Sequence, residues 1–363
     1  MIQKILKALI MLLFGAAIGY AGVRLGMYLG NSDTGAHLGP KWAALLLAFL
    51  GVWLALAWHE AGHLFAGLWQ GFRFELYIAG FLGARRHPQT SKVQWFFNKD
   101  PKLFGGVAAT LPVVESPDLV KRFAGVVAAG PLSSLLLALL AAGLGFLLSP
   151  ALPLVSFFFS ITAFISAGLF LATTIPSRTG PFFTDRARYF RLMGGGEAAE
   201  VERQMLSLTA WVYSGKSLEM LKDSDLSLVL LDKDYGTTAR FFLYFAHLQA
   251  GRNLEAAAEA KQLAAISKDM PVTFALEFWK ESFFSAAVLD PNINLARIWW
   301  DKVHIKVNNG KDISSLRLQA AWEMVNGRDA SDLLQKMKEQ LDSKTRLDAF
   351  EQAQQAWLLR TMA

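Results

Sequence analysis

The stretch AWHEAGHLFAG (57–67) contains two histidines and a glutamate within five residues. It follows directly on the apolar run WAALLLAFLGVWLAL, which begins at Trp42 and has the composition of a membrane-spanning helix. Each charged side chain at the centre of such a helix costs about 2.5–3.5 kcal/mol. The three ionisable residues His59, Glu60 and His63 therefore indicate a functional site inside the membrane.

His59 and His63 are four residues apart, so a helix presents both imidazoles on one face, with Glu60 beside them. This is the H-E-x-x-H pattern of zinc proteases. A catalytic zinc uses three protein ligands and an open position for water, whose pKa it lowers to about 7. We expect His59 and His63 to bind Zn²⁺ and Glu60 to act as general base. A chance occurrence of the pattern would not explain its position, about 25 Å along a membrane helix.

The composition indicates a membrane part followed by a soluble part. Of the 363 residues, 53% are hydrophobic and only 18% are charged, and most of the charges follow residue 174. The net charge of +6 is too small to indicate nucleic-acid binding, and the absence of cysteine excludes disulfides and thiolate metal sites. Four apolar stretches are long enough to cross a bilayer, at about residues 5–29, 42–68, 123–148 and 152–174.

Basic residues indicate which side of the membrane each loop faces. They precede the first span, follow the fourth, and number eight between the second and third, whereas the other two loops carry only Lys41. By the positive-inside rule, both termini are cytoplasmic. We expect a multi-pass protein embedded in the lipid bilayer of a bacterial cytoplasmic membrane.

The segment between the second and third spans, about residues 71–117, is predicted to form β-strands. FRFELYI (72–78) alternates apolar and polar side chains with a period of two residues. KVQWFF (92–97) and FGGVAATLP (104–112) follow it, separated by turns. We therefore expect a small sheet on the cytoplasmic side.

The chain after MGGGEAAE (193–200) is predicted to be helical. Three apolar helical runs are each followed by a turn and a second helix, at Gly251, Asp290 and Gly327, with spacings of 39 and 37 residues. These helical hairpins resemble tetratricopeptide-type repeats in architecture. Repeats of this kind bind peptides or proteins, so residues 197–363 are expected either to hold a protein partner or to cap the membrane domain.

Four motifs are similar to those of the site-2-protease family of intramembrane zinc metalloproteases. They are HEAGH (59–63), GGVAATLP (105–112), AAGPLSS (128–134) and IPSRTGPFFTDRARYF (175–190). The resemblance covers the membrane half of the chain, about residues 41–192.

The resemblance implies that an aspartate completes the zinc site, and the matching residue is Asp185. The family usually has glycine after it, where this chain has Arg186, and Thr184 can cap a helix that starts at Asp185. The family also tends to have asparagine where this chain has Ser134, for which we expect packing or a hydrogen bond. Other candidates for the third ligand are Glu115, Asp118, Asp100 and His87.

The resemblance also implies a membrane-associated β-sheet beside the zinc site. A transmembrane helix hides its peptide bonds because its backbone groups pair internally, so a protease must hold its substrate in an extended form. An exposed sheet edge does this by strand addition. We assign substrate binding to Phe74, Glu75, Leu76 and Tyr77, and the alternative is a hairpin that only plugs the cavity.

Together these features predict a mainly α-helical protein, with a transmembrane zinc metalloprotease domain at residues 1–192 and a soluble helical repeat domain at 197–363. We expect an endopeptidase that cuts a membrane-spanning protein near the cytoplasmic leaflet. One alternative is a catalytically silent, zinc-containing membrane scaffold, although a scaffold has no need of Glu60. A zinc transporter would need ligands on the outer side, which the first and third spans do not offer.

Overall fold

The structure is a computed structural model. It describes residues 41–87, 90–113, 116–149, 151–179, 182–221, 223–345 and 347–363. The span predicted at residues 5–29 lies outside these ranges. The chain divides into two compact units. The membrane unit comprises Met1–Arg178 and Phe183–Gly195, and the helical unit comprises Thr179–Phe182 and Gly196–Ala363.

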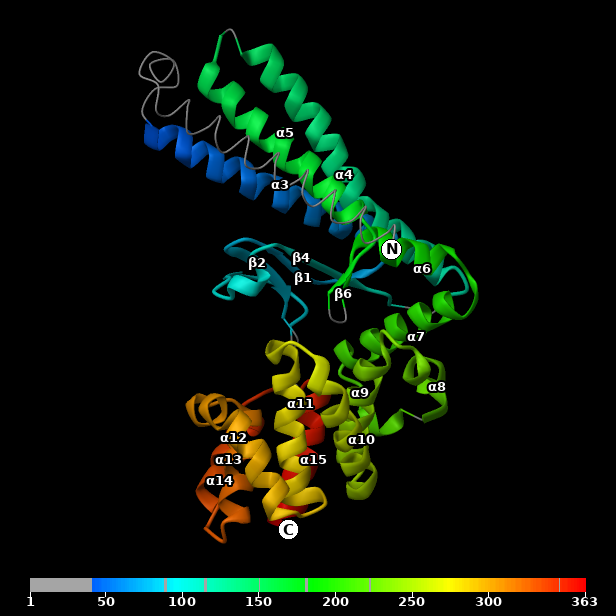
Figure 1. Cartoon of the computed structure of the whole chain (residues 1–363), viewed down its shortest axis with the longest axis vertical. Helices are drawn as coiled ribbons and strands as arrows, with labels where there is room; N and C mark the ends of the chain where they lie inside the picture. Colours follow the sequence, from blue (N-terminus) through cyan, green and yellow to red (C-terminus); the bar gives the residue numbers. More distant parts are fainter. Residues whose placement is uncertain are drawn as a thin grey trace. The chain divides into compact units, whose positions relative to one another are not determined.

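Three long helices of the membrane unit pack together, as Figure 1 shows. They are α3 (Lys41–Trp69), α4 (Leu119–Leu148) and α5 (Pro153–Thr174), and each is long and apolar enough to cross a bilayer. They lie where the second, third and fourth spans were predicted. Three candidate spans and a largely helical chain support an integral membrane protein, whereas the orientation of the termini stays a prediction.

Polar contacts between these helices tie their backbones together inside the membrane unit. The Trp58 side chain on α3 donates from Nε1 to the Ser133 carbonyl of α4, over 3.1 Å. The Ser156 hydroxyl on α5 donates to the Gly145 carbonyl of α4, over 2.6 Å. Hydrogen bonds between helices are favourable in hydrocarbon because no water competes for these groups. Both α3 and α5 therefore donate side-chain hydrogen bonds to the backbone of α4.

A four-stranded antiparallel sheet follows α3. Its strands are β1 (Arg73–Ala79), β2 (Leu82–Arg86), β3 (Val93–Phe97) and β4 (Val107–Leu111), and a short 3₁₀ turn (Pro101–Leu103) precedes β4. The order across the sheet is β3-β2-β1-β4. The prediction of a small sheet in this segment is therefore confirmed.

The expectation that the strand at 72–78 offers a free edge is wrong. β1 is paired with β2 on one side and with β4 on the other, so its backbone groups are already used within the sheet. Glu75 is the extra residue of a bulge, because the pairing with β4 shifts between Phe74 and Leu76. Among these four strands the free edges belong to β3 and β4.

The sheet lies along α3 rather than beyond its end. Tyr77 donates its hydroxyl to the Ala57 carbonyl over 2.8 Å, and Trp53 donates from Nε1 to the Ala79 carbonyl over 3.0 Å. Phe81, in the turn after β1, stacks on Trp53 with ring centroids 5.7 Å apart. Trp53 lies 16 residues before Trp69, about 24 Å along the helix. The turn between β1 and β2 therefore reaches the middle of the predicted span.

Two short strands and a short helix connect α5 to the helical unit. The strands are β5 (Arg178–Thr179) and β6 (Phe182–Phe183), and the helix is α6 (Asp185–Met193). The next helix begins after Gly195, whose φ of +68° is in the left-handed region that glycine adopts without strain.

The helical unit is a succession of helices that pack mainly on their neighbours in sequence. The helices are α7 (Gly196–Tyr213), α8 (Asp223–Leu231), α9 (Gly236–Gln249), α10 (Asn253–Ile266), α11 (Val272–Phe284), α12 (Ile293–Asn309), α13 (Ile313–Val325), α14 (Ser331–Asp342) and α15 (Ala349–Met362). Short 3₁₀ turns occur at Leu218–Met220 and Ser267–Asp269, and a π-helical turn at Ser285–Leu289 extends α11. The turns predicted at 251, 290 and 327 fall between helices, whereas the tetratricopeptide character stays a prediction.

Candidate metal centre

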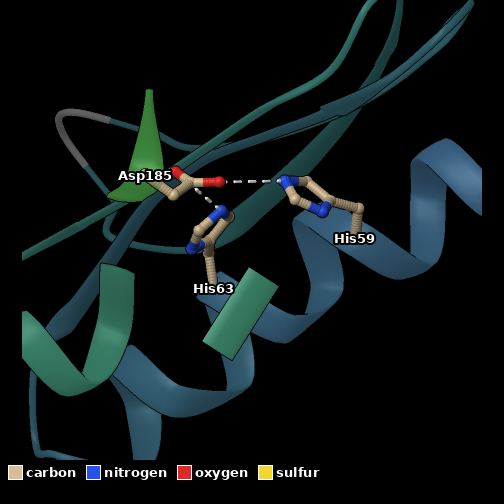
Figure 2. A group of neighbouring side chains, drawn as sticks. All are labelled: His59, His63 and Asp185. Atoms are coloured by element: carbon tan, nitrogen blue, oxygen red, sulfur yellow. Dashed lines mark ion pairs between the residues drawn. The ribbon is translucent and has the colours of Figure 1, made fainter. Parts of the chain in front are cut away.

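Two histidines and an aspartate from different helices converge in the membrane unit. His59 and His63 lie on adjacent turns of α3, and Asp185 is the first residue of α6. His59 Nε2 is 3.4 Å from one Asp185 carboxylate oxygen, and His63 Nε2 is 3.5 Å from the other. Figure 2 shows both imidazoles directed at the carboxylate. One ligand atom of each residue lies within 4.8 Å of the other two.

These separations fit a tetrahedral zinc ion. Zinc binds imidazole nitrogen and carboxylate oxygen at about 2.0–2.2 Å, which places neighbouring ligand atoms about 3.3–3.6 Å apart. Two imidazoles and one carboxylate are also a ligand set of catalytic zinc sites. Of the other candidates for the third ligand, Asp100, Asp118 and His87 do not join this group in the described part of the chain, and Glu115 lies outside it.

The other ring nitrogen of each histidine is held by α4. His59 Nδ1 is 2.8 Å from the hydroxyl of Ser134, which is fully buried. His63 Nδ1 donates to the Val126 carbonyl over 2.9 Å. Partners of this kind fix the tautomer and turn the Nε2 lone pair towards the metal. The hydrogen bond expected of Ser134 is present, whereas sequence reasoning missed Val126, because it contributes only a backbone oxygen.

Two glycines leave the space that these side chains occupy. A Cβ atom on Gly130 of α4 would overlap the His63 ring. Gly106 has a φ of +104°, and a Cβ there would lie 2.6 Å from Glu60 Cγ. Two motif glycines of the sequence, in AAGPLSS and GGVAATLP, therefore have a steric role at the site.

Glu60 is positioned next to the three residues without belonging to the group that they form. Its carboxylate accepts a hydrogen bond from the Ala108 backbone and is within electrostatic range of His59, His63 and Asp185. Ala108 belongs to β4, so the sheet and α3 together orient Glu60. A carboxylate beside a candidate zinc site is the arrangement that a general base requires.

The charge state of Asp185 suits a metal ligand. Burial raises the pKa of its carboxyl, but the neighbouring His59 and His63 side chains outweigh burial and lower the pKa to about 2. Asp185 is therefore anionic at neutral pH. Burial and the charge of Glu60 raise the pKa of Tyr77 to about 12, so its hydroxyl remains a donor.

Arg186 does not strain the backbone beside Asp185. Among the described residues other than glycine, only Ser91 has a positive φ, so the position after the aspartate needs no glycine. Thr184 occupies the N-cap position of α6, but its side chain makes no cap hydrogen bond.

The side chains assigned to substrate binding lie on β1 and have partners in the sheet or on α3. Glu75 forms ion pairs with Arg73 and, over 3.7 Å, with Arg86, and Tyr77 bonds to α3. Phe74 and Leu76 are half-buried on the same strand. Substrate contact by these four residues stays a prediction.

Comparison with known proteins supports the resemblance to the site-2-protease family. The sequence model of Peptidase family M50 matches residues 47–346, and the match extends beyond the residues 41–192 that carry the resemblance. No curated protein and no solved structure matches the chain. Since the match covers most of the chain, this protein belongs to Peptidase family M50, the site-2-protease family of zinc-dependent intramembrane metalloproteases.

Proposed function

We propose that this protein is an intramembrane zinc endopeptidase that cleaves a membrane-spanning protein near the cytoplasmic leaflet. The proposal rests on the convergence of the His59 and His63 Nε2 atoms on the Asp185 carboxylate, at 3.4 and 3.5 Å. A second carboxylate, that of Glu60, lies beside them on α3, the helix of the two histidines. The further carboxylate, Glu60, favours an enzyme over a zinc-containing scaffold, because metal binding alone does not need it.

His59, His63 and Asp185 would hold the zinc ion, and Glu60 would move the proton. Zinc, when bound, acts as a Lewis acid that polarises the scissile carbonyl and lowers the pKa of water. Glu60 accepts a proton from water as the water oxygen bonds to the carbonyl carbon. It then returns the proton to the departing amine nitrogen as the carbon–nitrogen bond breaks. The Ala108 backbone holds the Glu60 carboxylate in place for both transfers.

An extended substrate would add to the edge of β4. Among the described strands β4 pairs only with β1, so its other edge is open, and the Ala108 backbone of β4 lies next to the proton-transfer group Glu60. Strand addition there uses backbone hydrogen bonds and suits a substrate whose helix has unwound. Substrates whose backbone amides are N-methylated at alternate positions test this, because the methyl group removes the N–H donor. Cleavage should fall when the methylated amides are those that would bond to β4. It should persist when they are the amides that point away from β4.

The decisive experiment is Glu60→Gln in the full chain reconstituted in vesicles with a single-span reporter. We expect about one zinc per chain as in the parent and a fall in cleavage of about 10²–10⁴-fold, the range attributed to general acid–base catalysis. The control is Asp118→Asn, which neutralises an exposed carboxylate before α4 and should cleave at the parental rate. Parental cleavage by Glu60→Gln would contradict the proposal, and zinc binding without cleavage of any single-span reporter by the parent would favour the scaffold.

A further inference from the structure

Asp185 is the one ligand that does not come from α3, so its position depends on how α6 is joined to the rest of the membrane unit. A catalytic metal site requires its ligands within about 0.5 Å of their productive positions. α6 is a nine-residue helix that follows two short strands. A helix this short has little stability of its own, so packing and side-chain contacts must fix its first residue.

The residues on either side of Asp185 bond to the end of α5. The Thr184 hydroxyl donates to the Ile175 carbonyl over 2.9 Å. The Arg186 guanidinium donates from Nη1 to the Thr174 carbonyl over 3.2 Å. The last carbonyls of a helix have no partner within the helix and need one from elsewhere. Thr184 and Arg186 supply partners for two consecutive carbonyls, one on each side of the candidate ligand.

Further contacts hold these two side chains in place. The Thr184 hydroxyl also accepts a hydrogen bond from the Ser177 backbone over 3.0 Å, and the Thr184 amide donates to the Ser177 carbonyl over the same distance. The Arg186 guanidinium lies over the Phe190 ring, 5.3 Å from its centroid. Thr184 is thus bonded through both its backbone and its hydroxyl, and Arg186 is supported by the next turn of α6.

We propose that Thr184 and Arg186 are positioning residues, which clamp Asp185 between the end of α5 and the two histidines. The inference rests on the metal site of the proposed function. The histidines are oriented independently by Ser134 and Val126 of α4, so the clamp acts on the aspartate alone. Loss of the clamp should weaken metal binding and loosen the first turn of α6, without removing a ligand.

The main test is Thr184→Val, which removes the hydroxyl and keeps the shape of the side chain. We expect the zinc affinity of the full chain in detergent, measured by competition with a chelator, to fall about 10–100-fold, as for other outer-shell partners of metal ligands. The matched control is Thr173→Val, since the Thr173 hydroxyl bonds only within α5, to the Leu169 and Phe170 carbonyls. The control should stay within about twofold of the parent.

Two conservative changes separate positioning from general damage. Thr184→Ser keeps the hydroxyl and should restore the parental affinity. Arg186→Met should weaken zinc binding, and Arg186→Lys should recover most of the loss because it keeps a donor. Failure of both conservative variants to recover affinity would overturn the proposal.

A readout that needs no metal is hydrogen exchange of the Arg188 amide, which bonds to the Thr184 carbonyl over 3.0 Å. In the metal-free protein this exchange should be faster in Thr184→Val and unchanged in Thr173→Val. Asp185→Ala distinguishes a wrong role for Thr184 and Arg186 from a wrong metal site. If it loses zinc while Thr184→Val binds zinc as the parent does, the clamp is wrong and the metal site stands. If Asp185→Ala itself keeps zinc, the metal site fails.

Discussion

Ser134→Ala is expected to weaken zinc binding, although Ser134 does not touch the metal position. A histidine that binds a metal through Nε2 carries its proton on Nδ1, so His59 would donate to the Ser134 hydroxyl 2.8 Å away. Ser134 is fully buried and His59 is 6% exposed, so no water can replace the hydroxyl without a rearrangement. The substitution therefore leaves a buried N–H without a partner.

The size of the effect follows from that unpaired group. A buried donor without a partner costs about 1–3 kcal/mol. Part of this cost is avoided if the imidazole turns, but turning moves Nε2 away from Asp185 and also weakens binding. Losing an outer-shell partner typically lowers metal affinity about 10–100-fold, which corresponds to about 1.4–2.8 kcal/mol. The two estimates overlap, and we expect the zinc dissociation constant to rise by that factor.

The assay is competition with a chelator of known zinc affinity, using the full chain in detergent. The control is Ser166→Ala on α5. Ser166 is also fully buried, and its hydroxyl has no hydrogen-bond partner among the described residues. Removing a hydroxyl without a partner should leave zinc affinity within about twofold of the parent.

Parental zinc affinity in Ser134→Ala, together with loss of zinc in Asp185→Ala, would refute this account of His59. If Ser134→Ala loses zinc but the metal-free protein also melts at a lower temperature than Ser166→Ala, the hydroxyl has a structural role in α4. An unchanged melting temperature with weaker zinc binding is the expected result.

Two further predictions concern steric fit and helix capping. Gly130→Ala should abolish zinc binding because its Cβ would overlap the His63 ring, whereas Gly143→Ala on the same helix, with no atom near its Cβ, should bind zinc normally. Asp312→Ala should destabilise α13 by about 1 kcal/mol in urea titrations or hydrogen exchange, because the Asp312 carboxylate accepts from the Ser315 amide over 3.0 Å and from its hydroxyl over 2.7 Å. Burial raises the Asp312 pKa, but the Ser315 bonds lower it below the ordinary value, so this stabilisation should be present above about pH 4 and disappear as the pH falls through the folded-state pKa.

Local patterns of the sequence were sufficient for the three spans that the structure describes, for β1, β3 and β4, and for the histidine pair, whereas β2 was missed. A long apolar run fixes a membrane helix, because every backbone bond of the helix is internal. Period-two alternation fixes the strand at 72–78, and four-residue spacing fixes the shared face of His59 and His63. Each of these features depends on residues close in the chain.

The order of the strands could not be obtained in this way. Alternation shows that a segment is extended and which side chains share a face, but it does not identify the neighbouring strands. Substrate addition to β1 was expected, which requires a free edge, yet β4 returns from the end of the sheet to pair with β1. The backbone groups that face Glu60 therefore belong to β4, and the bulge at Glu75 has no sequence signal of its own.

The third member of the candidate metal site was predicted mainly by the resemblance to a family, and residue-level reasoning left several acidic residues and a histidine as rivals to Asp185. The return of the fourth span to the cytoplasmic side and a helix start after Thr184 also favoured Asp185, whereas the resemblance raised a conflict, because arginine follows where glycine is usual. The conflict disappears in the structure, since Asp185 starts a helix and Arg186 has no positive φ. A glycine at this position could not donate to the Thr174 carbonyl, as Arg186 does. In this chain, side-chain hydrogen bonds to the end of α5 thus help to position the aspartate. A glycine after the aspartate has no side chain and could not make such a bond.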